Sequence, residues 1–311
     1  MSYHPTIHIL LATYNGAKYL QEQLESLAQQ KYKKWTLTIS DDGSTDETIE
    51  IIKAFAKKRQ EQIRLLQGPS IGSSTRNFFH LIKQIPVENK EVLYAFCDQD
   101  DVWLNNKLVS AVQWHASQLD DPIRLYCGRT QYVNKQLKPI SLSSNVGRHA
   151  SFANALVQNI ASGNTMVFNS GVLAALKKIH PENSVWHDWT TYLITTAIGG
   201  SVGFDDKAHV LYRQHETNVI GANNGLISKI FRLKSLFKGR YKKWNDTNLS
   251  ALYDINKEIT PSSQKLLKNF CELRALEVPN QRIKSWLKTP IRRQTPVSNL
   301  SLGFAIFLGL V

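Results

Sequence analysis

The first hundred residues alternate between short apolar runs rich in β-branched side chains and longer segments of helical periodicity. Residues 7–14 have the pattern of a buried strand, the next segment places Leu20, Leu24 and Leu27 at helical spacing, and residues 35–44 have the pattern of a second strand. Alternation of this kind predicts βαβ units and a mostly parallel sheet with helices on both faces. The expected fold class is therefore α/β, with a Rossmann-like sheet.

The alternation continues along the chain and places polar clusters where strands end. A helix capped by Ser44, Thr45 or Asp46 comes next, and the further expected elements are a strand at 63–68, a helix around 77–85 and a strand at 91–101. The motif TYNG follows the first strand, DDGSTD the second and DQDD the fourth. Because sheets of this kind bind ligands at the carboxyl ends of their strands, these clusters mark the expected site.

The positive charge of the chain is concentrated in its last third. The net charge is +13, and residues 1–225 carry 22 Lys and Arg against 20 Asp and Glu, whereas residues 226–311 carry 16 against 5. We therefore expect a boundary near residue 225, between an α/β domain over residues 1–225 and a basic helical region over residues 226–311.

Cysteine spacing and hydropathy favour a cytoplasmic chain. The three cysteines lie far apart and show no CxxC spacing, which supports neither a disulfide framework nor a zinc site. The N-terminus lacks the cationic and long apolar regions of a secretory signal. No segment reaches the ~18 apolar residues of a membrane-spanning helix.

Three carboxylates fall within the DQDD motif, at the end of an expected strand. Asp98, Asp100 and Asp101 repel one another there unless they are solvated, hydrogen-bonded or neutralised by a cation. Oxygen ligands without neighbouring His or Cys favour Mg²⁺ or Mn²⁺, held by one or two carboxylates and completed by substrate phosphates. The motif therefore predicts a metal site that binds a nucleotide diphosphate. The alternative is a solvated acidic loop.

The DDGSTDET motif offers acceptors for the imide or ribose groups of a nucleotide through Asp41 and Asp42. A helix cap with a turn at Gly43 explains the same residues. We expect both roles, with the cap made by Ser44 to Asp46 and the ligand contact made by Asp41.

A further acid lies between an imidazole and an indole at His187, Asp188 and Trp189. Partial burial there should raise the pKa of Asp188 towards that of a working general base, and the neighbouring rings are candidates for binding a sugar acceptor. An acid with a structural role at a helix N-terminus is the alternative. In the later YRQHETN motif, Arg213 is a candidate for binding phosphate oxygens and His215 for contacting a metal or diphosphate.

Seven motifs occur in one order over about residues 5–220: TYNG, DDGSTDET, STRNF, CDQDDVW, SGNTMVF, HDW and YRQHETN. In this order the chain resembles the family 2 glycosyltransferases of GT-A fold, particularly bacterial rhamnosyltransferases. The resemblance implies that Thr13 and Asp41 line the nucleotide pocket and that Arg76 lies near the base and phosphates. It also implies that YRQH closes over the diphosphate.

By the same resemblance, DQDD corresponds to the DxD motif of the family. Asp98 would contact the ribose side, Asp100 would hold a divalent metal that bridges the diphosphate, and Asp101 would support it. Inverting members have an acid, often in a Glu-Asp pair, that deprotonates the acceptor hydroxyl. Asp188 stands at that place, and this chain departs from the pair by having His187 before it.

The basic segment 226–244 interleaves seven Lys and Arg with apolar residues that a helix would gather on one side. Such a helix suits an anionic membrane surface, and a second basic stretch after Glu277 leads into an apolar end. The alternative is that this region packs on the α/β domain or on another subunit. The sequence is therefore compatible with a homo-oligomer. Nucleic-acid binding is disfavoured because no recognisable module accompanies the charge and the acidic motif would repel a strand.

The leading hypothesis is an inverting, metal-dependent glycosyltransferase that transfers rhamnose from dTDP-rhamnose to a lipid-linked cell-envelope polysaccharide. It would work in the cytoplasm at the inner face of the membrane, with Mn²⁺ or Mg²⁺. A UDP-hexose donor is the nearest alternative. A nucleotidyltransferase should have a Gly-rich basic loop after the first strand, where this chain has ATYNGAKY. A non-catalytic scaffold is disfavoured because Asp98, Asp100 and Asp188 are all present.

Overall fold

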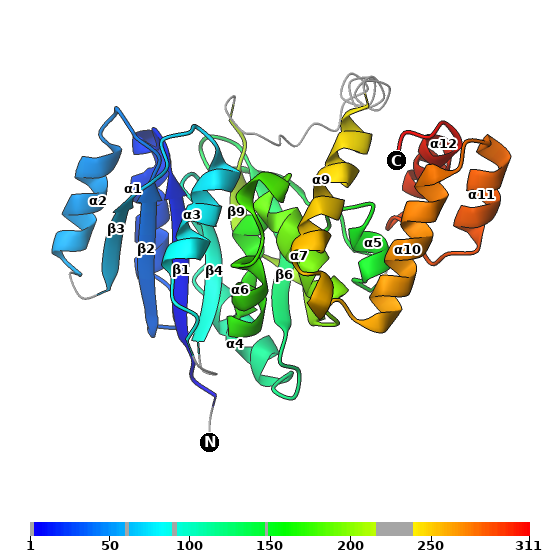
Figure 1. Cartoon of the computed structure of the whole chain (residues 1–311). Coiled ribbons are helices and arrows are strands. Elements are labelled where there is room, and N and C mark those ends of the chain that lie inside the picture. The colour runs from blue at the N-terminus through cyan, green and yellow to red at the C-terminus, as the bar shows by residue number, and fades with distance from the viewer. Residues whose placement is uncertain (1–2, 60–61, 89–91, 147–148, 216–238) are drawn as a thin grey trace.

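The computed structural model describes residues 3–59, 62–88, 92–146, 149–215 and 239–311. Within them a nine-stranded sheet has the order β3-β2-β1-β4-β8-β6-β9-β5, with β7 paired to β6 at the side (Figure 1). The strands are β1 (Thr6–Thr13), β2 (Trp35–Asp41), β3 (Ile63–Gln67), β4 (Val92–Asp98), β5 (Val102–Trp103), β6 (Arg124–Val133), β7 (Pro139–Leu142), β8 (Val167–Asn169) and β9 (Ser201–Arg213). The predicted α/β class is confirmed.

The first part of the sheet is the predicted parallel unit. β1 pairs in parallel with β2 and with β4, and β2 pairs in parallel with β3. The register sets Thr13 opposite Asp41 and Ala12 opposite Asp98. The TYNG, DDGSTD and DQDD motifs therefore meet at one edge of the sheet. β8 runs antiparallel to β4 and β6, which makes the sheet mixed.

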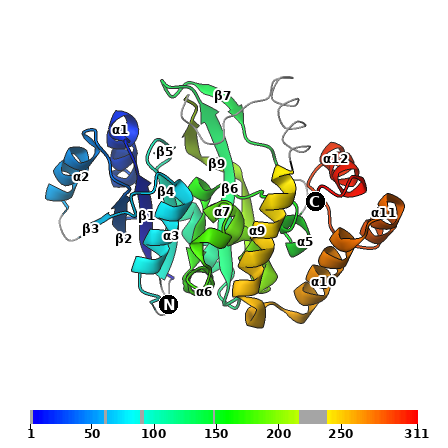
Figure 2. The same cartoon turned by 45° about the horizontal axis from the view of Figure 1, so that its top comes forward.

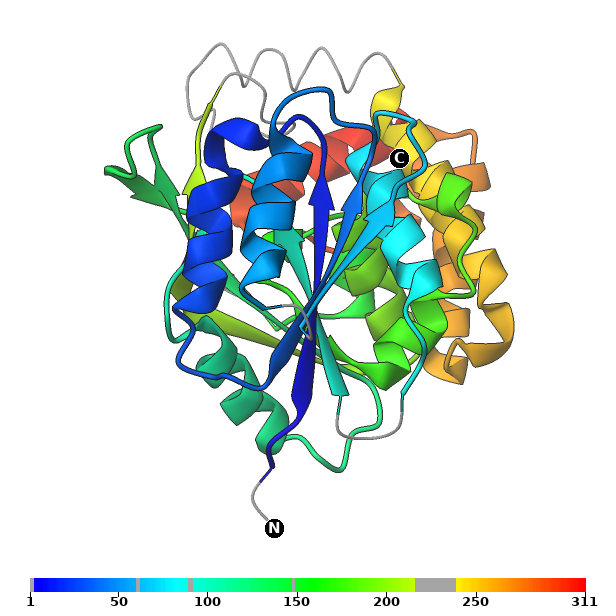
Figure 3. The same cartoon turned by 90° about the vertical axis from the view of Figure 1, so that its left-hand side faces the viewer.

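Helices cover both faces of the sheet (Figure 3). The face with α1 (Ala17–Ala28), α2 (Thr48–Lys57) and α4 (Lys107–Ala116) encloses one hydrophobic cluster, in which the predicted Leu20, Leu24 and Leu27 are buried. The opposite face carries α3 (Ser74–Gln84), α5 (Phe152–Ala155), α6 (Ser170–Leu176) and α7 (His187–Ala197), which enclose the second cluster.

Four helices beyond residue 239 extend the second cluster: α9 (Arg240–Asp254), α10 (Pro261–Ala275), α11 (Pro279–Leu287) and α12 (Pro296–Phe307). Figure 2 shows α9 along α7 with the other three beyond it. Trp189 of α7 and Trp244 of α9 pack edge to face, with ring centroids 6.2 Å apart. Tyr241, Phe270 and Leu302 are buried in the same cluster as α7. The described part of the tail thus packs on the α/β domain.

Some expected features differ from the structure or fall outside it. α2 begins at Thr48 rather than after a Ser44–Asp46 cap, but the Asp46 carboxylate does accept hydrogen bonds from the Thr48 N–H and hydroxyl. The boundary near residue 225 and the basic stretch up to residue 238 lie outside the described residues. Cys97, Cys127 and Cys271 are free. In the part of the chain that is described, no helix is both long enough and apolar enough to cross a membrane.

Candidate active site

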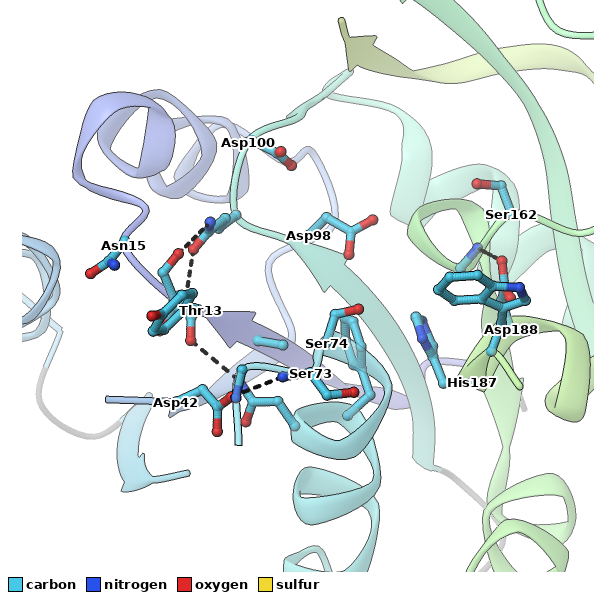
Figure 4. A pocket seen from close by; sticks show the side chains of 18 of the residues that line it. Thr13, Asn15, Asp42, Ser73, Ser74, Asp98, Asp100, Ser162, His187 and Asp188 are labelled. Carbon is cyan, nitrogen blue, oxygen red and sulfur yellow. Dashed lines mark hydrogen bonds between the residues drawn. The ribbon is translucent and has the colours of Figure 1, made fainter. Parts of the chain in front are cut away.

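A pocket of about 520 Å³ lies at the carboxyl edge of β1 and β4. Its walls come from the loops after these two strands, the start of α3, the short helix η1 (Gly163–Thr165) and the start of α7. Figure 4 shows Thr13 and Asp42 on one side, His187 and Asp188 on the other, and Asp98 between them. Residues from all seven sequence motifs therefore line this pocket.

The two adjacent acids after β2 have different surroundings. The Asp41 carboxylate accepts hydrogen bonds from the Thr13 hydroxyl (2.9 Å) and from the Ser44 N–H (2.8 Å), and it is not among the pocket-lining residues. Asp42 lines the pocket, and its carboxylate accepts the Gly72 N–H (2.7 Å). Of the three residues expected to bind the nucleotide here, Thr13 and Asp42 line the pocket, whereas the Asp41 carboxylate is hydrogen-bonded within its own loop and to Thr13.

The DQDD motif supplies two pocket carboxylates and one buried support. Asp98 and Asp100 line the pocket, and burial together with the charges of Asp100 and Asp188 raises the pKa of Asp98 to about 8. The Asp100 carboxylate lies 2.7 Å from Nε2 of His215. Asp101 is fully buried beneath them, where burial and the two neighbouring acids raise its pKa well above the usual range.

Asp101 and Arg213 hold this loop from behind. Asp101 accepts hydrogen bonds from the Asn164 amide (2.5 Å) and from the Arg213 N–H (3.3 Å). The buried Arg213 guanidinium donates to the Asp100 carbonyl oxygen (3.0 Å), and it forms an ion pair with Glu22 of α1. Arg213 is not among the pocket-lining residues. Its binding of phosphate oxygens stays a prediction; in this structure its guanidinium contacts the Asp100 carbonyl oxygen and Glu22 from behind the Asp100 loop.

Asp188 is placed in the pocket wall by the first turn of α7. Its carboxylate accepts the N–H of Trp189 (2.6 Å) and that of Gly163 (3.3 Å). Burial raises the pKa of Asp188 to about 6, and the hydrogen bonds to the carboxylate oppose part of that rise. Such a pKa leaves a carboxylate that is ionised at neutral pH and more basic than an ordinary Asp.

His187 lies beside it as a buried, neutral imidazole. The ring stacks on Phe78, with centroids 3.9 Å apart, and meets the edge of Phe96 at 4.9 Å. Burial lowers the pKa of His187 to about 3. Its Nε2 has no hydrogen-bond partner among the described residues. A Cβ at Gly163 would lie 2.5 Å from this atom, so glycine is the residue that lets η1 approach the ring.

Trp189, the aromatic residue predicted to bind the acceptor, does not line the pocket. Trp189 is buried in the hydrophobic core, where its indole N–H donates to the Ala155 carbonyl oxygen (2.7 Å). Trp186, three residues earlier, lines the pocket instead. The rotation between successive residues of α7 turns Asp188 towards the pocket and Trp189 towards the hydrophobic core.

Arg76 lies on the first turn of α3, at a smaller hollow of about 240 Å³ that shares Ser73, Ser74 and Trp186 with the main pocket. Its guanidinium is 3.5 Å from the Glu182 carboxylate. Arg76 is thus at the margin of the site rather than among the residues that line the main pocket.

Similarity to known proteins establishes the family to which this chain belongs. The family model for Glycosyl transferase family 2 matches residues 8–180. The dTDP-rhamnosyl transferase RfbG of Shigella flexneri is 31% identical over 259 residues, which is 78% of this chain and 85% of that protein. This chain belongs to glycosyltransferase family 2.

Solved structures agree with the fold of a family 2 glycosyltransferase. The S. aureus TarS 1-349 structure in complex with UDP-GlcNAc has a TM-score of 0.54 at 15% identity, covering 90% of this chain and 81% of that one. The mannosyltransferase PcManGT from Pyrobaculum calidifontis, in complex with GDP-Man and Mn²⁺, has a TM-score of 0.53 at 16% identity, covering 99% and 86%. The predicted GT-A fold is confirmed.

The pocket of this glycosyltransferase has carboxylates that could supply some of the ligands of a divalent metal. Within the described residues no three His, Cys, Asp or Glu side chains gather to hold a metal by themselves. Asp98 and Asp100 nevertheless face one pocket with mutually unfavourable charges, which a hard divalent cation would offset. Two carboxylates completed by phosphate oxygens are a common arrangement for Mg²⁺.

Several contacts of the site have no signal in the sequence. The Gln99 side chain bonds both the N–H and the carbonyl oxygen of Tyr14, at 2.9 and 3.0 Å, and so joins the loops after β4 and β1. Glu22 pairs with Arg213 across 191 positions of chain. Gly163 lies within the SGNTMVF motif, but its closeness to His187 depends on how η1 and α7 pack. Each of these contacts joins residues that are far apart along the chain.

Proposed function

We propose that this family 2 enzyme is an inverting, metal-dependent rhamnosyltransferase, which uses dTDP-rhamnose and a lipid-linked cell-envelope polysaccharide acceptor. The observation that carries the mechanism is the placement of Asp188, a carboxylate with a pKa of about 6, in the same pocket as Asp98 and Asp100. The proposed sugar is supported by the 31% identity to a dTDP-rhamnosyl transferase over most of both chains.

The donor half of the pocket is the side of Thr13, Asp42 and Asp98. Asp42 and Thr13 offer oxygens to the base and ribose, and Asp98 lies between them and the acceptor half. When bound, Mn²⁺ or Mg²⁺ would be held by Asp100, with His215 beside it, and would offset charge on the diphosphate. Asp101 and Arg213 keep the Asp100 loop in position from behind.

The acceptor half is the side of Trp186, His187 and Asp188. The Asp188 carboxylate takes the proton of the acceptor hydroxyl while that oxygen attacks the anomeric carbon of the donor. The bond from the anomeric carbon to the diphosphate oxygen breaks, and the nucleoside diphosphate leaves with the bonding electrons. A single displacement from the opposite face inverts the configuration, so no enzyme nucleophile is needed.

His187 and Trp186 orient the acceptor in this scheme. The ring of the neutral imidazole lines the pocket and bounds its acceptor side, while its Nε2 is buried and has no hydrogen-bond partner among the described residues. An indole face is a good apolar surface for a sugar ring. Together they distinguish the acceptor half from the carboxylate-rich donor half.

The proposed function is tested by measuring the rates of sugar transfer and of donor hydrolysis with and without Mn²⁺ or Mg²⁺. Four donors are compared: dTDP-rhamnose, UDP-glucose, UDP-galactose and UDP-N-acetylglucosamine. We expect metal-dependent turnover of dTDP-rhamnose with inverted product, lost in Asp100→Asn. Preferred turnover of a UDP-sugar would replace the proposed donor. Binding of none of the four donors, measured by calorimetry, would contradict the transferase assignment of this pocket.

A separate measurement tests the metal site without relying on turnover. The folded-state pKa of Asp98 is raised to about 8, so at pH values above 8 its ionised form destabilises the fold, and a bound cation removes that penalty. The measurement is made at pH 8.5, about half a unit above that pKa. There we expect Mn²⁺ together with dTDP to raise the melting temperature more than dTDP alone does. Asp100→Asn should lose this difference.

A further inference from the structure

The segment that follows α5 brings Asn159 against the Asp188 carboxylate. The Asn159 amide donates a hydrogen bond to this carboxylate. The same carboxylate accepts the N–H groups of Trp189 and Gly163, as described above. The side-chain oxygen of Asn159 accepts the Ala161 N–H (3.1 Å), so the amide nitrogen is the end that is left to face the acid. Asn159 therefore contacts the proposed base from outside α7, the helix that carries it.

The two residues before this asparagine are held by the C-terminal helices. The Val157 carbonyl oxygen accepts the hydroxyl of Tyr241 on α9 and Nε of Arg293 (3.2 Å). The Gln158 side-chain oxygen accepts the backbone N–H of Gln294 (2.8 Å). These last two donors lie on the connection between α11 and α12. Three donors from the tail therefore converge on two consecutive residues of the α/β domain.

The junction between the tail and this segment is buried and reinforced. Val157 and Tyr241 are 1% and 8% exposed, so water does not readily replace the hydrogen bond between them. The Arg293 guanidinium lies over the Tyr241 ring, 4.9 Å from its centroid, and holds the ring in one orientation. A further bond runs from the Asn154 amide of α5 to the Arg292 carbonyl oxygen (3.0 Å). Such a junction fixes the position of the segment as well as covering it.

Helix α7 holds the other side of α5. The Trp189 indole, one residue after Asp188, donates to the Ala155 carbonyl oxygen at the end of α5 (2.7 Å). The same ring meets Trp244 of α9 edge to face. The start of α7, α5 with the segment after it, and the tail therefore form one continuous set of contacts that ends at the Asp188 carboxylate.

We propose that the C-terminal helices hold the Asp188 carboxylate in place for the reaction through residues 157–159, with Asn159 as the positioning residue. This inference rests on the proposed function, since it takes Asp188 as the base. The three tail residues that hold the segment are not among those that line the pocket, so they act only through it. A displacement of Val157 reaches Asn159 across two planar peptide units, and a base misplaced by about 1 Å costs up to about 10²-fold in rate.

The first test measures hydrolysis of dTDP-rhamnose by the full chain, with water as the acceptor. Asn159→Ala should lower kcat about tenfold and leave donor affinity by calorimetry unchanged, because Asp188 lies on the acceptor half. Tyr241→Phe removes only the hydroxyl donor and should lower kcat about threefold. Since both changes act on one carboxylate, the double variant should lose little more than Asn159→Ala alone. Additive losses would overturn the proposal.

A second measurement follows the Asp188 carboxyl without turnover. The full chain is labelled with ¹³C at the aspartate carboxyl carbons, and the NMR signal of Asp188 is identified by its loss in Asp188→Asn. The hydrogen bond from Asn159 favours the ionised form, so Asn159→Ala should raise the measured pKa by about one unit. Tyr241→Phe should raise it by less. An unchanged pKa in Asn159→Ala would overturn the proposal.

Two matched controls separate positioning from general stability. Tyr32→Phe also removes a hydroxyl that donates to a backbone carbonyl oxygen, that of Pro5 (2.5 Å), just before β1. Asn183→Ala also removes an amide that donates to an aspartate, Asp254 (3.0 Å), and this bond likewise joins the α/β domain to α9. Neither should change the hydrolysis rate or the Asp188 titration. Thermal melting checks that every variant is folded.

The outcomes separate this proposal from the proposed function. The expected shift of the Asp188 titration, without hydrolysis of any donor, would support the positioning and contradict the transferase. Normal hydrolysis with equal effects of the test variants and their controls would contradict the positioning and leave the transferase intact. If Tyr241→Phe does not fold, Gln158→Met takes its place, because it removes the acceptor of the Gln294 N–H.

Discussion

The pocket and α12 depart from ordinary burial in opposite directions. In the pocket, carboxyl groups are held away from water, and the pKa values of Asp98 and Asp188 rise to about 8 and about 6. On α12, apolar side chains face water, with Leu300 76% exposed. Each arrangement is unfavourable by itself, because burial penalises a charge and water penalises an apolar surface. For the pocket we propose that a cation and a nucleotide offset the cost.

The largest effect should follow from removing the base on the pocket side. Asp188→Asn keeps the shape of the side chain but cannot accept a proton, so we expect the transfer rate to fall about 10³-fold. Donor affinity should change little, because Asp188 lies on the acceptor half. Rates are measured at saturating donor, with the exposed Asp206→Asn as the control acid. A loss smaller than about tenfold would mean that another group is the base.

Which side of α12 is buried can be tested by comparing two leucines of this helix. Leu302→Ala, on the buried side, should lower the free energy of unfolding by about 2–5 kcal/mol because it leaves a cavity. Leu300→Ala, two positions earlier and exposed, should change it by less than about 0.5 kcal/mol. Denaturant titration measures both. Equal costs would show that Leu300 is covered in the folded chain and would remove the contrast with the pocket.

Within the pocket, a smaller effect is expected from Gly163→Ala. The added Cβ would lie 2.5 Å from Nε2 of His187, so the imidazole must move and the acceptor loses its alignment. We expect about a tenfold lower transfer rate. In the His187→Ala background the ring is gone, and Gly163→Ala should then cost little. Additive losses in this double-mutant cycle would argue that the two residues act separately.

The smallest effect is a dependence on pH that only the pocket should show. Because the base acts as a carboxylate and its pKa is about 6, kcat/KM should be constant above about pH 7 and should fall about tenfold per unit below pH 6. An ordinary Asp would keep full activity down to about pH 5. A profile without a break near pH 6 would assign the rate to a group other than Asp188.

Much of the site was predictable because it is built from local patterns. Strand ends meet at one edge of a parallel sheet, so TYNG, DDGSTD and DQDD had to come together once the alternation was recognised. The raised pKa of Asp188 was predictable from burial beside aromatic residues. The exposure of Leu300 and the burial of Leu302 on α12 were not predicted, because the sequence pattern does not show which side of this apolar helix packs on the core.

The sequence alone determined the α/β class, the family and the motifs that surround the pocket, because periodicity and strand-end chemistry are properties of short segments. The tertiary structure decided which side chains line the pocket. Asp42 rather than Asp41 and Trp186 rather than Trp189 line the pocket, and Arg213 turns to Glu22 and the Asp100 carbonyl oxygen. The physical reason is that side-chain direction depends on turns, helix rotation and partners from distant parts of the chain, which no short segment contains.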